Sequence, residues 1–225
     1  MESSLHRQLK ELYGGPAEDL EVQVDGYRID AVVRGRLFEI QQASLASLRV
    51  KVASLLERHR VVVVKPLVSR KYLIRRDRPG GEIVSARYSP IHETVLNLFE
   101  DLVHFVNVFP HPRLTLEVVL TAQEEHRITK VRRRRRGPDF RVEDRLLVEV
   151  VSTKKLRTAA DLRKLLPATL PAEFTTEELA RHAQIPRWLA QKMAYCLRKT
   201  GADEVRGKQG NNWVYSAPRR TRRAA

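Results

Sequence analysis

The hydrophobic pattern of the first third of the chain predicts a helix followed by a three-stranded meander. Leucines recur at helical spacing over residues 3–13, and Gly14 and Gly15 then end the helix. Alternating apolar and polar residues follow in short runs, separated by dipeptides that favour tight hairpin turns. The predicted strands are residues 21–24, 27–33 and 37–42.

The next two patterns predict a helix and a buried strand. Residues 45–56 are amphipathic with helical spacing, and residues 60–68 contain the run VVVV, which is typical of a strand that is buried on both faces. A strand reached through a helix is expected to pair in parallel by a right-handed crossover. The pattern therefore predicts an αβββαβ order and an α/β fold whose mixed sheet is flanked by helices.

The middle of the chain continues this pattern as far as residue 166. We expect a hairpin of residues 71–76 with 82–88 and then a helix at residues 93–109. Two strands at residues 114–124 and 145–151 and a short helix at residues 159–166 are expected to follow.

The single cysteine, Cys196, is predicted to pack inside a later helix, and one cysteine cannot form an internal disulfide.

Composition narrows the class of protein. The net charge of +15 favours an anionic partner, and nucleic acid is the commonest large anion in cytoplasm. A basic surface can also attract membranes or only keep a chain soluble. The run KVRRRRRG at residues 130–137 reads as a solvated loop or a phosphate contact. No apolar run is long enough for a membrane span, and no signal peptide is evident, so we expect a cytoplasmic protein.

A compositionally distinct C-terminal unit follows the linker at residues 167–171. Thr175 and Glu178 have capping-box spacing, residues 187–199 form a second amphipathic helix that Gly201 closes, and a Gly-rich hairpin follows. This order resembles a winged helix-turn-helix over residues 171–216. The resemblance implies contacts with double-stranded DNA from these residues: Arg187, Gln191, Lys192, Lys199, Arg206 and Lys208.

The C-terminal unit has alternatives to DNA binding, because winged helices also serve as protein-contact or structural modules. Trp188 and Trp213 are predicted to pack in the core of this unit, with bracing of the wing as an alternative for Trp213. The predicted domains are an N-terminal α/β domain at residues 1–166, the winged helix at residues 171–217 and a basic tail at residues 218–225.

An acidic pair lies within the predicted meander. If the strands pair around the Arg34-Gly35 turn, Asp30 and Glu39 lie nearly opposite each other among apolar residues, where desolvating a carboxylate is costly. One hard divalent cation would relieve both that cost and their repulsion. Glu2 is in phase with the leucines of the first helix and could join the site.

These residues resemble the signature of the PD-(D/E)XK nuclease superfamily, and residues 1–68 are similar to it in order and spacing. The resemblance implies a restriction-endonuclease-like fold, with Mg²⁺ or Mn²⁺ held by Asp30, Glu39 and the Ile40 carbonyl, and Gln41 in the position of the family's Lys. The whole chain is also similar to an uncharacterised bacterial family of predicted nucleases with a C-terminal helix-turn-helix.

Two departures from the signature stand out. Ile29 replaces a Pro, and Gln41 can orient water or bond a phosphate oxygen but carries no charge to stabilise the transition state. Either Lys51 or Lys65 could compensate for the missing charge, or cleavage is slow or lost. A simpler interpretation is that nearby arginines neutralise the acids; these are Arg28, Arg34 and Arg36. A second match to the signature, Pro138-Asp139 with Glu149, has an apolar third residue, Val151, and lacks a crossover after it.

The function expected from the sequence is a metal-dependent endonuclease that hydrolyses phosphodiester bonds in DNA, with catalytic residues Asp30, Glu39 and Gln41 and with metal ligands that include Glu2. Cleavage of both strands would favour a homodimer. The alternative is a catalytically inactive nuclease fold that acts as a DNA-binding regulator. A third interpretation is an RNA-directed enzyme or an assembly subunit.

Overall fold

The computed structural model describes residues 2–15, 19–130 and 139–218. The arginine run expected to form a loop or a phosphate contact and nearly all of the predicted basic tail lie outside these residues.

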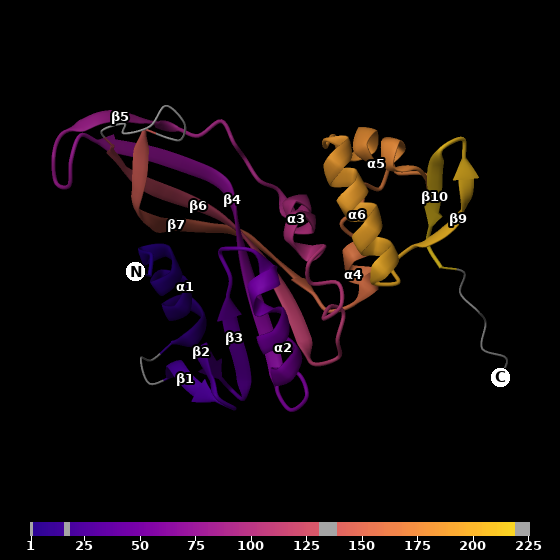
Figure 1. Cartoon of the computed structure of the whole chain (residues 1–225), viewed down its shortest axis with the longest axis horizontal. Helices are drawn as coiled ribbons and strands as arrows, with labels where there is room; N and C mark the ends of the chain where they lie inside the picture. Colours follow the sequence, from indigo (N-terminus) through magenta and orange to yellow (C-terminus); the bar gives the residue numbers. More distant parts are fainter. Residues whose placement is uncertain (1, 16–18, 131–138, 219–225) are drawn as a thin grey trace.

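The N-terminal part of the chain is an α/β structure built on one mixed sheet (Figure 1). The seven strands have the order β1-β2-β3-β4-β6-β7, and β5 pairs with β4 off this path. Strand β4 is parallel to both β3 and β6, whereas the other pairs are antiparallel. The elements are α1 (Ser4–Gly14), β1 (Leu20–Val24), β2 (Tyr27–Val33), β3 (Arg36–Ile40), the 3-10 helix η2 (Leu45–Leu48), α2 (Arg49–Leu55), β4 (Arg60–Arg76), β5 (Ile83–Tyr88), the 3-10 helix η3 (Val95–Asn97), α3 (Leu98–Leu102), β6 (Leu114–Thr129) and β7 (Phe140–Leu156).

Helices cover both faces of this sheet. Val62 and Val64 pack with Leu5 and Leu9 of α1, because successive residues of a strand point to opposite faces. Val61 and Val63 point the other way and belong to a second cluster that includes Val52 and Leu55 of α2. The run VVVV is therefore buried on both sides, as its composition predicts.

The structure corrects the predicted helix at residues 93–109. Regular helix extends only through η3 and α3, and the chain then continues in short turns to residue 108. Phe105 and Phe109 are fully buried here, so tertiary packing outweighs the weak helical preference of the local sequence. Strand β4 joins the two strands predicted at residues 60–68 and 71–76, and its outer half forms the predicted hairpin with β5. Strands β6 and β7 are longer than predicted, since their polar outer halves still pair in the sheet.

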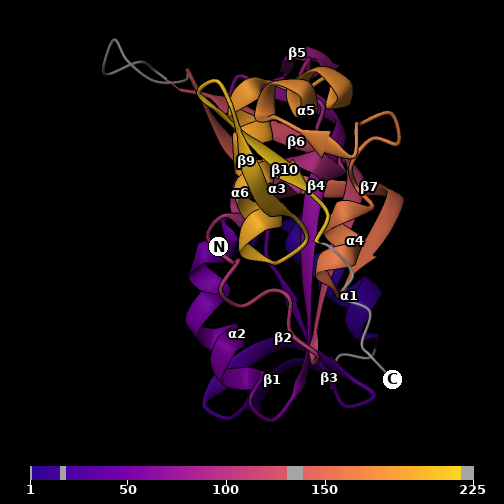
Figure 2. The ribbon, with the colours of Figure 1, turned by 90° about the vertical axis from the view of Figure 1, so that its right-hand side faces the viewer.

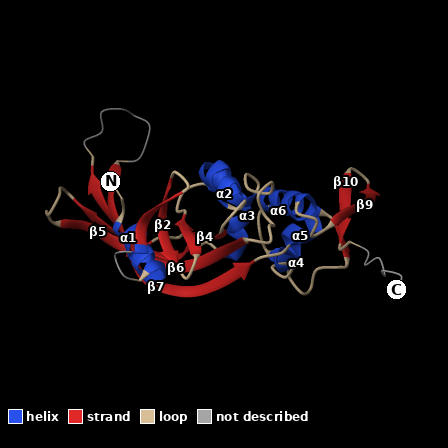
Figure 3. Ribbon diagram, turned by 90° about the horizontal axis from the view of Figure 1, so that it is seen from below, coloured by secondary structure: helices blue, strands red, loops and turns tan. Residues whose placement is uncertain are grey.

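The C-terminal unit contains three helices and a small sheet of order β8-β10-β9. The Thr175 side chain and the Glu178 side chain form the predicted capping box at the start of α5. Figure 3 shows this unit beyond one end of the large sheet. Its elements are α4 (Ala159–Arg163), β8 (Glu173–Phe174), α5 (Thr176–Ala183), α6 (Arg187–Lys199), β9 (Glu204–Gln209) and β10 (Asn212–Ser216).

The two parts of the chain share a hydrophobic core. Leu102 of α3 and Met193 of α6 belong to one buried cluster, and α3 lies beside α6 in Figures 1 and 2. Burial raises the pKa of Cys196 to about 12, which agrees with the packing role predicted for it. The predicted core packing of the tryptophans is wrong, because Trp188 is 48% exposed and Trp213 is 50% exposed.

Among the residues that the structure describes, no helix has both the length and the apolar composition needed to cross a bilayer.

Candidate active site

A tight turn brings Asp30 and Glu39 together. Arg34 and Gly35 have φ of 50° and 70°, which suits the two central positions of a type I′ hairpin turn between β2 and β3. The antiparallel register pairs Ala31 with Phe38. Continued by one residue, that register puts Asp30 opposite Glu39 on one face of the sheet.

The Asp30 carboxylate is held by two donors. The backbone N–H of Ile40 donates to Oδ2 at 2.7 Å, and His6 Nε2 of α1 lies 3.2 Å from Oδ1. Burial alone would raise the pKa of Asp30, but the hydrogen bonds from His6 and Ile40 and the charge of Lys51 outweigh it and lower the pKa. Asp30 is therefore a carboxylate, rather than a neutral acid, at neutral pH.

Glu39 is more deeply buried and is paired with Lys51 of α2. Its side chain is 5% exposed, and Lys51 Nζ lies 2.6 Å from Oε1 while it also donates to the Arg28 carbonyl at 2.5 Å. The ion pair is close but poorly aligned, so Oε1 has no hydrogen bond of good geometry. Burial raises the pKa of Glu39, opposed by Lys51, and the nearby Asp30 charge raises it further.

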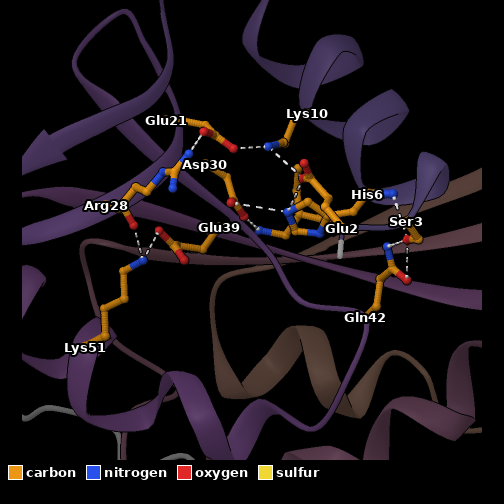
Figure 4. A network of polar contacts seen from close by, with 11 residues as sticks. Glu2, Ser3, His6, Lys10, Glu21, Arg28, Asp30, Glu39, Gln42 and Lys51 are labelled. Carbon is orange, nitrogen blue, oxygen red and sulfur yellow. Dashed lines mark hydrogen bonds and ion pairs between the residues drawn. The ribbon is translucent and has the colours of Figure 1, made fainter.

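A connected set of ion pairs lies beside Asp30 and Glu39 (Figure 4). Glu2 Oε1 lies 2.6 Å from Lys10 Nζ and 3.4 Å from His6 Nε2. Lys10 also pairs with Glu21, which in turn pairs with Arg28. Glu2 precedes the N-cap Ser3 and so lies outside α1, contrary to the helical phase predicted for it, and its carboxylate is engaged by Lys10 at the edge of the site.

Gln41 has a local structural role in this structure. Its amide Nε2 donates to the Ser44 carbonyl and to Ser47 Oγ, both at 2.8 Å, and so supports the turn of η2. Lys65 is 3% exposed and is also engaged, because Nζ bonds the Ala43 carbonyl and Asp101, both at 2.6 Å. Of the two lysines that could replace the charge missing at Gln41, Lys51 is the one that contacts Glu39.

The donor set suits a hard cation with a mainly aqueous shell. The described residues contain no group of three or more His, Cys, Asp or Glu side chains that could hold a metal ion. Mg²⁺ is often bound by only one or two carboxylates and keeps several waters. Asp30 and Glu39 with a backbone carbonyl satisfy that requirement, although His6 and Lys51 would have to yield some of their contacts.

The second match to the nuclease signature does not form a site. Pro138 lies outside the described residues, and Asp139 precedes β7 and pairs with Arg75 at 3.0 Å. Glu149 lies ten residues further along the chain, 3.8 Å from Arg70. At about 3.3 Å of rise per strand residue, the two carboxylates cannot converge.

The side chains predicted to contact DNA lie along α6 and in the β9–β10 hairpin. Arg187 Nη2 donates to Asn212 Oδ1 at 3.2 Å, which ties the start of α6 to the hairpin. Arg206 is engaged by Ser216 Oγ and Glu204, both at 2.7 Å. The other four side chains are not engaged in such hydrogen bonds or ion pairs, and they lie at the surface or near it; these are Gln191, Lys192, Lys199 and Lys208.

Sequence reasoning missed His6 and the orientation of Gln41. His6 lies one residue after Leu5 on the first turn of α1 and contacts both Glu2 and Asp30, and no motif in the sequence singles it out. No local signal indicates that the Gln41 amide turns toward η2, because that orientation depends on the fold of the following loop.

The chain is similar to a protein family over its N-terminal part and to an individual protein over most of its length. The family model described as "Domain of unknown function (DUF8091)" matches residues 3–157, which include the acidic pair. A protein of Treponema pallidum (strain Nichols), described as uncharacterized, is 30% identical over 215 residues, covering 95% of this chain and 84% of the relative. No solved structure matches the chain.

Proposed function

This chain belongs to the DUF8091 domain family, and we propose that it is a metal-dependent nuclease that hydrolyses phosphodiester bonds in DNA. The observation that carries the proposal is the opposition of Asp30 and Glu39 on adjacent antiparallel strands, with Lys51 beside them. A buried carboxylate, Glu39, opposite the half-buried Asp30 is costly to maintain unless a cation or a function requires it.

The topology around the pair supports this proposal. The order α1-β1-β2-β3-α2-β4, with β3 parallel to β4, is what the resemblance to the PD-(D/E)XK superfamily implies. The acids lie on β2 and at the carboxyl end of β3, with helices on both faces of the sheet. A restriction-endonuclease-like fold is therefore the finer description that we propose for the N-terminal part.

The proposed metal ligands are the carboxylates of Asp30 and Glu39 and the carbonyl of Ile40. A bound Mg²⁺ or Mn²⁺ supplies a Lewis acid for the phosphoryl oxygen and lowers the pKa of a bound water. The low pKa of Asp30 keeps one ligand charged at neutral pH, because His6 and the Ile40 N–H stabilise the carboxylate. We assign Glu2 to holding Lys10 and His6 rather than to the metal.

We propose that Lys51, rather than Gln41, provides the positive charge that the family's Lys would supply. Its ammonium already lies 2.6 Å from Glu39, so a phosphate bound at the acidic pair would meet it. The Gln41 amide is directed toward Ser44 and Ser47 and is uncharged.

The C-terminal unit is proposed to be the DNA-binding part of the molecule. Two helices joined by a turn and followed by a two-stranded hairpin are the parts of a winged helix-turn-helix, and α6 carries most of the polar side chains predicted to contact DNA. The net charge of +15 supports a polyanionic partner.

One observation favours the second candidate, a catalytically inactive DNA-binding regulator. Asp30 and Glu39 already have His6 and Lys51 as partners, so their charges are partly compensated by the protein itself. In that case the nuclease fold is a scaffold, and Asp30 and Glu39 are structural.

The test is cleavage of plasmid and of end-labelled DNA with Mg²⁺, Mn²⁺ or EDTA. The wild type is compared with the Asp30→Asn/Glu39→Gln double variant and with Glu117→Gln, a matched change at another buried carboxylate of the sheet. We expect cleavage by the wild type and by Glu117→Gln only with a divalent cation, and none by the double variant.

Equal cutting by the double variant would remove the assigned site. Salt-dependent DNA binding without cleavage in either cation would instead support the regulator. Lys51→Met is expected to slow cleavage more than Gln41→Ala, and the reverse order would contradict the assignment of Lys51.

A further inference from the structure

Exposed aromatic rings and lysines alternate along one face of α6. Trp188, Lys192, Tyr195 and Lys199 are separated by four, three and four residues, which places them in one stripe of the helix. Lys192 Nζ lies 5.3 Å from the centre of the Trp188 ring, and Lys199 Nζ lies 5.9 Å from that of Tyr195. The two rings are 48% and 38% exposed.

The β9–β10 hairpin repeats this arrangement. Trp213 is directly opposite Lys208 in the strand register, it is 50% exposed, and Lys208 Nζ lies 4.6 Å from the centre of its ring. Thus each large exposed aromatic ring in the described part of the C-terminal unit has a lysine against it. Tyr88, an exposed ring on β5, contacts Tyr72 instead.

The stripe borders a hollow in the surface, which we call the aromatic groove. It has a volume of about 570 Å³ between the end of α3 and α6 and is lined by Val103, His104, Trp188, Gln191, Lys192 and Tyr195. Exposed aromatic surface of this kind marks a binding site more often than an inert surface. The lysines mean that the occupant must offer negative charge as well as flat apolar area.

A second pocket begins at the same lysine. Lys192 also lines a pocket of about 560 Å³ that reaches Gln42 and Ser44, in the loop that follows β3 and the acidic pair. Five cationic side chains line this pocket against three acidic ones. The cationic residues are Lys65, Lys71, Arg127, Arg145 and Lys192.

An unpaired polynucleotide strand matches both requirements. Its bases expose flat faces that stack on Trp and Tyr, and its phosphates pair with lysine, whereas a duplex hides its base faces within its own stack. We propose that the aromatic groove binds an unpaired polynucleotide strand, with bases stacked on Trp188 and Tyr195 and phosphates against Lys192 and Lys199.

This inference deepens the proposed nucleic-acid binding of the C-terminal unit and rests on it, but it does not require cleavage. The pocket that Lys192 also lines extends from the aromatic groove toward the loop after β3, and three of its cations pair with Glu125; these are Lys71, Arg127 and Arg145. The substrate class of the proposed nuclease would then be DNA with an unpaired segment, rather than an uninterrupted duplex.

The experiment measures binding by the full-length chain in EDTA, so that no metal-dependent cleavage occurs. The probes are labelled oligo(dT), oligo(U) and a hairpin duplex, each of about 20 nucleotides, which exceeds the usual single-strand site size. The chain has two tryptophans, both exposed in the C-terminal unit, and Trp188 lines the groove, so Trp188 fluorescence reports stacking there directly. Trp213→Phe and Trp188→Phe leave one reporter each.

We expect the single strand to quench Trp188 and to bind more tightly than the hairpin. Trp188→Ala/Tyr195→Ala should weaken single-strand binding by about ten-fold or more, whereas Tyr88→Ala, the matched control, should not. The oligo(dT) and oligo(U) arms distinguish DNA from RNA as the source of the strand. Thermal unfolding verifies that the variants are folded.

Unchanged affinity in the folded double variant, absence of quenching, or equal dependence of hairpin binding on the two rings would each overturn the proposal. A dimer that Trp188→Ala dissociates and that oligonucleotide does not compete with would also overturn it. The Asp30→Asn/Glu39→Gln variant separates the two proposals, since it should lose cleavage and keep single-strand binding.

Discussion

Replacing Lys51 by Met should leave Glu39 as an uncompensated charge in the sheet. Loss of one partner from a buried ion pair costs about 3–5 kcal/mol. The Lys51 side chain is 20% exposed, and the Asp30 N–H still donates to Glu39, so we expect a smaller loss of about 2–4 kcal/mol in the free energy of unfolding. For a chain of this size, that corresponds to a fall in Tm of roughly 5–15 °C.

The pH dependence of this loss identifies its cause. Burial raises the pKa of Glu39 above that of an ordinary glutamate, and removing Lys51 raises it further. A carboxyl group with a raised pKa costs no stability below its unfolded pKa and costs most once the pH exceeds its folded pKa. The deficit of Lys51→Met relative to the wild type should therefore be largest at pH 7–8 and shrink toward pH 4.5.

Urea denaturation at several pH values measures this effect, with a double-mutant cycle through Glu39→Gln. The matched control is Lys155→Met, because Lys155 is 58% exposed and lies 3.5 Å from the buried Glu117, which keeps its hydrogen bond from Tyr13. The control should lose less than about 1 kcal/mol. Equal losses in the two lysine variants, or a deficit that does not change with pH, would refute the reasoning.

Three further changes test other parts of the structure. Burial raises the pKa of Asp203 to about 6, so the ionised carboxylate costs stability above that pH. Asp203→Asn should raise the free energy of unfolding by about 1–3 kcal/mol at pH 8, measured by urea denaturation, and should leave it unchanged near pH 4. Glu125 accepts hydrogen bonds from Arg145, Arg127 and Lys71, and these contacts outweigh the effect of burial and lower its pKa to about 2. Glu125→Gln should therefore lower the free energy of unfolding by about 2–3 kcal/mol at pH 7, and this difference should disappear as the pH falls from 4.5 to 2. Gln41→Ala should cost about 1 kcal/mol in thermal unfolding, by loss of its bonds to the η2 turn, and should leave DNA cleavage unchanged.

The parts of the fold that depend on local physics could be predicted from the sequence. The leucine spacing of α1 and the tight turn at Arg34-Gly35 are short-range signals, and the turn also fixes the register that opposes Asp30 and Glu39. The capping box of α5 is another such signal.

The remaining features depend on tertiary packing. The short α3 follows from burial of Phe105 and Phe109, and the exposure of Trp188 follows from which face of α6 packs on α3. Within the candidate site, the contacts of His6 and Lys51 depend on how α1 and α2 lie against the sheet, so the sequence alone could nominate the two acids but not their partners.

The central claim is that Asp30 and Glu39 together hold a divalent cation. Anomalous diffraction from crystals soaked in Mn²⁺ tests it most directly, since the metal is located without reference to activity. We predict a peak between the two carboxylates, with Lys51 displaced from Glu39 Oε1. Crystals in which the soaked metal binds elsewhere, while His6 and Lys51 keep their contacts with the two acids, would contradict the claim.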